Sequence, residues 1–234
     1  MTNCEKNALV IGIDIILVLS LLSCSNVSYG QNLDTRLWTG IELEWDISEK
    51  IDIGVDVQNR LENNLNAFDK MFIEPSLNYS LHRNWRIGFS YRFIYAQDKN
   101  YRKKFEQRIS VLLGYKKEVF EDLMIRTRTA VQYDSDSFLQ EWRERNDEII
   151  IRNRLKIEYD LFGVPITPFI SYEFFLFVRD GTGVFTDQWR VTAGLIYRYS
   201  KKSGIKLSYA FNNEIFDNRR RDANIFSIQY NLKL

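Results

Sequence analysis

The 234-residue chain has two cysteines, three prolines and one histidine. Cys4 and Cys24 both lie near the N-terminus, so a chain that loses this segment has neither a disulfide framework nor thiol chemistry. The scarcity of proline leaves long segments free to form strands. With His82 as the only histidine, placed between two predicted strands, the chain has little material for a nucleophile and base pair, and we expect no catalytic residues.

Long apolar runs and an excess of one charge are also missing. After residue 30 no run approaches the about twenty apolar residues that a membrane-spanning helix needs. The 32 basic and 31 acidic residues nearly cancel, which argues against nucleic acid as a partner. The stretch 181–183 is too short for a phosphate-binding loop, and the acidic spacing in 134–137 is common by chance. We therefore expect no cofactor and no metal.

The N-terminus has the pattern of a secretory signal peptide, with Lys6 followed by an apolar core at 15–22. Small residues at Ser28 and Gly30 favour cleavage before Gln31, which divides the chain into a signal peptide, 1–30, and a mature domain, 31–234. Two alternatives stay open. Leu21 to Cys24 loosely resembles a lipoprotein box that would leave Cys24 lipidated, and a retained anchor helix is disfavoured by Asp14.

The mature region is dominated by alternation of apolar and polar residues. Between 85 and 95 the apolar row is Trp85, Ile87, Phe89, Tyr91, Phe93 and Tyr95. Ten residues at about 3.3 Å each, tilted by about 40°, rise about 25 Å, which is the height of the apolar band of an outer-membrane barrel. Aromatic residues ten positions apart predict a girdle at each edge of this band, formed by Trp85, Tyr95, Phe105, Tyr115, Trp189 and Tyr199.

Eleven segments show this period of two: 35–46, 51–61, 70–81, 85–95, 102–115, 123–133, 148–159, 166–178, 186–199, 205–213 and 224–234. Short and long connections alternate between them, the long ones being 62–69, 96–101, 134–147, 179–185 and 214–223. The pattern predicts an all-β fold, an up-and-down antiparallel transmembrane β-barrel of ten to twelve strands with the long connections outside the cell. We expect an even strand number, so either 35–46 is not a wall strand or a twelfth strand exists.

The end of the chain supports an outer-membrane location. Counting back from the last residue, every second position is apolar: Leu234, Leu232, Tyr230, Ile228 and Phe226. This matches the terminal strand by which outer-membrane barrels are handed to the barrel-insertion machinery. The expected partners are therefore this machinery and the outer-membrane lipids.

Three stretches resemble one known family: Leu37 to Glu44, Phe72 to Leu77 and Trp85 to Arg92. They are similar to the domain of unknown function DUF2490, and the resemblance covers essentially the whole mature chain. It implies an outer-membrane β-barrel of a Gram-negative bacterium. It carries no catalytic residues to transfer.

The polar face of each segment would line the lumen. The basic residues expected there are Arg86, Arg92, Arg108, Arg126, Arg128, Arg152, Arg154, Arg190 and Arg198, with Lys156 and Lys206. The acidic residues expected there are Glu42, Glu44, Asp52, Asp56, Glu74, Glu106, Glu158 and Glu173. An arginine-rich wall would favour small anionic solutes. Alternatively, acidic and basic walls would close a narrow lumen with salt bridges.

The sequence thus predicts a non-enzymatic outer-membrane protein, either a narrow porin-like channel with anion bias or a closed structural barrel. The alternatives are an outer-membrane lipid-modifying enzyme and a soluble periplasmic all-β binding protein. Some polar residues fall on rows assigned to lipid and test the strand register: Asn59, Gln107, Thr127, Thr129 and Asn153.

Overall fold

The computed structural model describes residues 33–97, 103–136, 148–179, 183–216 and 219–234. The predicted signal peptide and both cysteines lie outside these residues. The described chain forms eleven strands: β1 (Leu33–Asp46), β2 (Ile51–Glu62), β3 (Ala67–Ser80), β4 (Trp85–Gln97), β5 (Lys103–Phe120), β6 (Leu123–Asp136), β7 (Glu148–Tyr159), β8 (Ile166–Arg179), β9 (Gly183–Tyr197), β10 (Ser203–Phe216) and β11 (Arg219–Lys233). Within those ranges no helix is long and apolar enough to cross a membrane.

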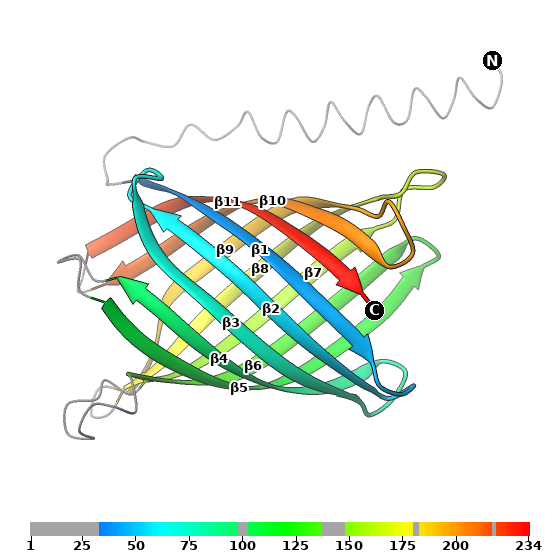
Figure 1. Ribbon diagram of the computed structural model, residues 1–234, viewed down its shortest axis with the longest axis horizontal. Coiled ribbons are helices and arrows are strands. Elements are labelled where there is room, and N and C mark those ends of the chain that lie inside the picture. The colour runs from blue at the N-terminus through cyan, green and yellow to red at the C-terminus, as the bar shows by residue number, and fades with distance from the viewer. Residues whose placement is uncertain (1–32, 98–102, 137–147, 180–182, 217–218) are drawn as a thin grey trace, which may run out of the picture. The chain divides into compact units, whose positions relative to one another are not determined.

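The strands close into one barrel in which each strand pairs with its neighbours in sequence (Figure 1). All neighbours are antiparallel except β1 and β11, which pair in parallel and close the barrel. The predicted β-barrel is confirmed, but the expectation of an even strand number is wrong. Because β1 is a wall strand and directions alternate, an odd total makes the first and last strands run the same way.

The two ends of the barrel are named here by the chain: β1 begins at the N-terminal mouth, and β11 ends at the C-terminal mouth. Strands extend into most of the connections predicted to be long. For example, β10 reaches Phe216 and β11 begins at Arg219, within the predicted loop 214–223. On β4, for example, the apolar row ends at Tyr95, but the pairing with β5 continues to Gln97. Alternation therefore marks the width of the apolar band rather than the ends of the strands.

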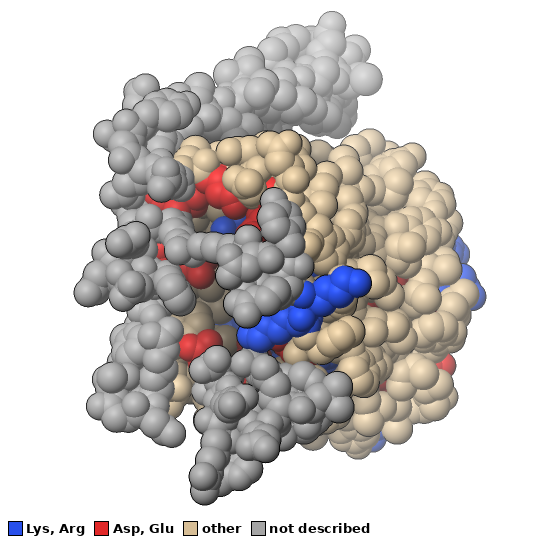
Figure 2. Space-filling view, turned by 60° about the vertical axis from the view of Figure 1, so that its left-hand side comes forward, with Lys and Arg blue, Asp and Glu red and all other residues tan. Residues whose placement is uncertain are grey.

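The outer wall is apolar. Phe89, Leu113 and Leu207 point outward and are 44–48% exposed, and Figure 2 shows a wall that is mostly free of charged side chains, whereas charges gather at the opening. The aromatic pairs form in register, Trp85 with Tyr115 at a ring-centroid distance of 4.8 Å and Tyr95 with Phe105 at 5.4 Å. At the other two girdle positions, the ring of Trp189 packs on Phe211 and the hydroxyl of Tyr199 bonds that of Tyr230.

Three of the five polar residues predicted on the outer wall, Gln107, Thr129 and Asn153, have side-chain hydrogen-bond partners there. The Thr129 hydroxyl donates to Asn153 Oδ1 at 2.8 Å across the β6–β7 ladder. The Tyr91 hydroxyl donates to Gln107 across β4 and β5. Each pair provides a hydrogen bond that a hydrocarbon surrounding could not supply. These outward polar residues are therefore compatible with the predicted register.

Small residues shape the inside of the wall. Ala210, Ala223 and Ile225 are almost fully buried, and Trp38 of β1 packs against them. On β9, Gly194 lies beneath Phe169 and close to the backbone of β10. A Cβ added at Gly194 would lie 2.4 Å from the Leu207 carbonyl oxygen and 2.7 Å from Phe169 Cζ.

We expect Gly194→Ala to destabilise the barrel by about 1–3 kcal/mol, because the backbone of β10 would have to move. Gly114→Ala is the matched control, since its added Cβ would lie 3.7 Å from the nearest atom. Its effect should stay within about 0.5 kcal/mol. Urea unfolding followed by tryptophan fluorescence measures both variants. Equal effects would contradict the close packing at Gly194.

Candidate functional site

The lumen holds a cavity of about 520 Å³. Among the residues that line it, ten are lysine or arginine and seven are aspartate or glutamate. Several residues predicted to face the lumen lie here: Asp56, Arg92, Glu106, Arg108, Arg152, Arg154, Lys156, Glu173, Arg190 and Lys206. The residues that line the cavity therefore carry more positive than negative charge.

Glu173 is the centre of the largest ion-pair cluster in the described chain. Its Oε1 lies 3.0 Å from Arg152 Nη2 and 3.4 Å from Arg128 Nη2, and its Oε2 lies 3.8 Å from Arg190 Nη1. The register explains the cluster, because β8 places Glu173 directly opposite Arg154 on β7 and Arg190 on β9. One carboxylate, only 7% exposed, is thus shared by three guanidinium groups.

The other lumen ion pairs run along the wall. Arg92 binds Glu74 between β4 and β3, and Arg108 binds Asp134 between β5 and β6. Arg126 binds Glu158 between β6 and β7. Side chains that face the same way on neighbouring strands are about 5 Å apart, which is within reach of an ion pair. Among the described residues, the inter-strand ion pairs join strands that are at most two places apart. These residues therefore do not form the salt bridges between opposite walls that one of the two alternatives predicts.

Aromatic rings alternate with arginines along part of the lumen. The guanidinium carbon of Arg92 lies 3.9 Å from the ring centre of Phe72, and that of Arg60 lies 5.1 Å from the same ring. Arg60 also lies 3.9 Å from the ring of Trp38. Arg190 lies 4.9 Å from the same indole. Cation–π attraction of this kind stabilises each contact by about 0.5–2 kcal/mol.

The series continues on β8 and β7. Arg190 lies 5.4 Å and Arg152 lies 4.9 Å from the ring of Phe175. We call the whole series the arginine–aromatic row, in spatial order Arg92, Phe72, Arg60, Trp38, Arg190, Phe175 and Arg152. Trp38 reaches from β1 towards β9 and packs on Ala210 of β10 and Ala223 of β11. The indole thereby joins the two halves of the arginine–aromatic row.

Four members of this row were missed from the sequence: Trp38, Arg60, Phe72 and Phe175. Alternation was sufficient to find them, because Trp38 is four residues from Glu42 and Arg60 is four residues from Asp56, on the same faces. The assignment of aromatic residues to the outer wall explains why Trp38, Phe72 and Phe175 are missed, but it does not explain why Arg60 is missed. On β1, β3 and β8 the lumen face is aromatic as well.

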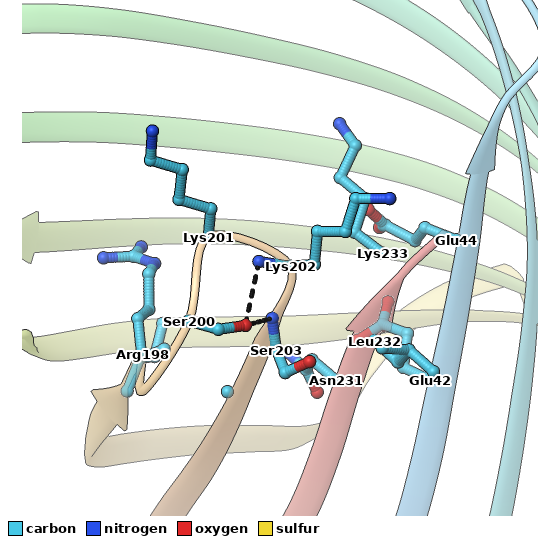
Figure 3. Close-up of a pocket in the computed structure, with 12 residues that line it drawn as sticks. Glu42, Glu44, Arg198, Ser200, Lys201, Lys202, Ser203, Asn231, Leu232 and Lys233 are labelled. Atoms are coloured by element: carbon cyan, nitrogen blue, oxygen red, sulfur yellow. Dashed lines mark hydrogen bonds between the residues drawn. The ribbon is translucent and has the colours of Figure 1, made fainter.

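Five other predicted residues lie towards the C-terminal mouth: Glu42, Glu44, Asp52, Arg86 and Arg198. Arg86 Nη2 is 3.4 Å from Asp52 Oδ2. A small pocket of about 140 Å³ brings Glu42 and Glu44 of β1 near Arg198, which follows β9 (Figure 3). In the turn beside them, Ser200 Oγ accepts hydrogen bonds from the backbone N–H groups of Lys202 and Ser203. Glu74 and Arg128, in contrast, pair with Arg92 and Glu173, which line the central cavity.

His82 lies in the turn between β3 and β4 and lines another cavity at the C-terminal mouth, with Arg83 and Lys116. In the described part of the chain, no group of three or more histidine, cysteine, aspartate and glutamate side chains has the arrangement to hold a metal ion.

The model of a family described as "Protein of unknown function (DUF2490)" matches residues 35–223. Among solved structures, the chain is similar to one titled "Bacterial polysaccharide outer membrane secretin", with a TM-score of 0.53 and 9% identity over 78% of this chain and 64% of that one, less than two thirds of its length. It is also similar to "NanC porin structure in rhombohedral crystal form", with a TM-score of 0.49 and 13% identity over 86% of this chain and 100% of that one. No curated protein sequence matches.

Proposed function

The chain belongs to the DUF2490 family of proteins of unknown function, and from this premise we propose that it is a non-enzymatic outer-membrane β-barrel that forms a narrow, anion-preferring channel. Two parts of this proposal have separate support. The outer wall supports the location, and the lumen supports the channel.

The outer wall carries large exposed apolar side chains on every strand from β1 to β11. Contiguous apolar surface of this extent is rare on soluble monomers and is typical of contact with lipid. Paired aromatic rings towards both mouths, Trp85 with Tyr115 and Tyr95 with Phe105, match the girdles at the two membrane interfaces. Together these features favour a barrel that is embedded in the outer membrane.

The observation that carries the channel proposal is the excess of cations around the cavity. Glu173 is shared by three arginines, and in the described part of the chain neither Arg60 nor Arg154 has an ion pair. Fixed positive charge in a water-filled lumen raises the local concentration of anions. Because the ion pairs of the described residues lie along the wall and do not tie opposite walls together, they support a lumen that solutes can enter.

Planar-bilayer recording in a salt gradient tests this function. We expect a small conductance whose reversal potential has the sign of anion preference, and we expect Arg154→Gln to move that potential towards zero. Arg198→Gln is the control, because Arg198 is half exposed at the C-terminal mouth and has Asp160 at 3.3 Å. Cation preference would contradict the proposal, and absence of current would favour the closed structural barrel.

A further inference from the structure

Arg60 is held by contacts that leave most of its hydrogen-bond donors available, whereas Arg190 uses Nε on Asn212 Oδ1 at 3.0 Å and has Nη1 3.8 Å from Glu173. A guanidinium group stacks through its flat face, whereas its five N–H donors point outward in the plane. Arg60 makes one hydrogen bond in the described chain, from Nε to Gln58 Oε1 at 2.7 Å. Its position is set by the rings of Trp38 and Phe72, so its terminal N–H groups are not needed to hold it in place.

Two further donors of the row, one on Trp38 beside Arg60 and one on Arg152 beside Phe175, have no partner in the described chain. Trp38 Nε1 and Arg152 Nε are buried and make no hydrogen bond in the described part of the chain. A buried donor without an acceptor costs about 1–3 kcal/mol, so such groups in native proteins call for an explanation. Both belong to the row, and both side chains line the cavity. Unused donors and excess positive charge thus occur together at one place.

From this geometry we infer that the arginine–aromatic row is a saturable binding site for the oxyanion groups of small solutes, centred on Arg60, Trp38 and Arg190. The inference rests on the proposed function and names the class of anion. Carboxylate, sulfate and phosphate oxygens accept two hydrogen bonds side by side and fit the guanidinium fork, whereas chloride cannot. A cavity of about 520 Å³ suits a solute of small-molecule size.

Trp38 provides a reporter inside the proposed site. The purified full-length barrel in detergent is titrated with succinate, sulfate and phosphate at constant ionic strength, with chloride as the reference anion. We expect a saturable change in tryptophan fluorescence for at least one oxyanion and none for chloride. The change should disappear in Trp38→Phe, which keeps a ring for stacking but lacks the indole N–H. The oxyanion that binds best distinguishes a carboxylate ligand from a sulfate or phosphate ligand.

The arginines are tested by calorimetry in the same detergent. We expect the double variant Arg60→Gln with Arg190→Gln to bind the oxyanion about ten- to a hundred-fold more weakly, and Arg198→Gln to bind it as the unchanged protein does. Heat-modifiable migration on a gel reports folding. If the double variant fails to fold, Trp38→Phe remains as the test, with an expected loss of at least about three-fold in affinity.

Binding in detergent does not depend on current through a bilayer, so the two proposals fail separately. An anion-preferring current with no saturable oxyanion binding would overturn the site and leave the channel standing. Saturable binding that is weakened in the variants, but without current, would overturn the channel and support the site. Equal binding by the unchanged protein and the double variant would also overturn the site.

Discussion

Replacing Glu173 with glutamine is expected to destabilise the folded barrel by about 3–5 kcal/mol, the cost of removing one partner from a buried ion pair. Arg152, Arg128 and Arg190 would keep their charges and lose the carboxylate that they share. The side chains of Glu173 and Arg152 are only 7% and 15% exposed, so water compensates little of this loss. The side-chain amide of glutamine can still accept a hydrogen bond but has no negative charge. The variant therefore tests the contribution of the Glu173 charge.

Asp160→Asn is the control for this experiment. It also removes a carboxylate from an arginine, Arg198 at 3.3 Å, but the Asp160 side chain is 62% exposed. Exposed pairs contribute about 0–1 kcal/mol, so little change is expected. Urea unfolding of both variants gives the comparison, and bilayer recording should show a stronger anion preference in Glu173→Gln. Equal stability of the two variants would mean that Glu173 does not hold the arginines together.

The local part of the fold follows from the sequence because alternation is a local property. A strand with one polar and one apolar face has a sequence period of two residues. This period predicts eleven segments, which match β1 to β11. The same period placed Glu173 and Arg190 on one face. It could not show that the two are opposite each other, since register depends on both strands and on the bulge between Phe175 and Leu176.

Two features could not be predicted because they depend on the closed barrel. The parallel contact of β1 with β11 joins the two ends of the chain, and no local pattern marks it. The position of Trp38 depends on Ala210 and Ala223, which are far away in sequence and leave room for the indole. The assumption that aromatic residues point outward holds for Phe89. It fails inside this lumen, where the rings of Trp38, Phe72 and Phe175 contact arginines.

Replacing Phe89 with arginine is expected to destabilise the barrel in lipid by about 2–4 kcal/mol, the cost of a charged side chain near the bilayer midplane. Phe89 points outward, is 48% exposed, and lies on β4 between the girdle residues Trp85 and Tyr95. Phe162→Arg is the matched control, with the same substitution in the turn between β7 and β8. Phe162 is 94% exposed there, beyond the ends of the strands, and its variant is expected to change stability by less than about 0.5 kcal/mol.

This pair of variants separates the membrane barrel from a soluble all-β protein, which strand alternation alone cannot do. In water, an outward and half-exposed Phe89 would tolerate arginine almost as well as Phe162 does, because neither side chain would leave a core. In lipid, only the arginine at position 89 faces hydrocarbon. Reversible urea unfolding in lipid vesicles measures both free energies. A difference of less than about 1 kcal/mol would contradict the outer-membrane location, because the cost of a charge in hydrocarbon would be missing.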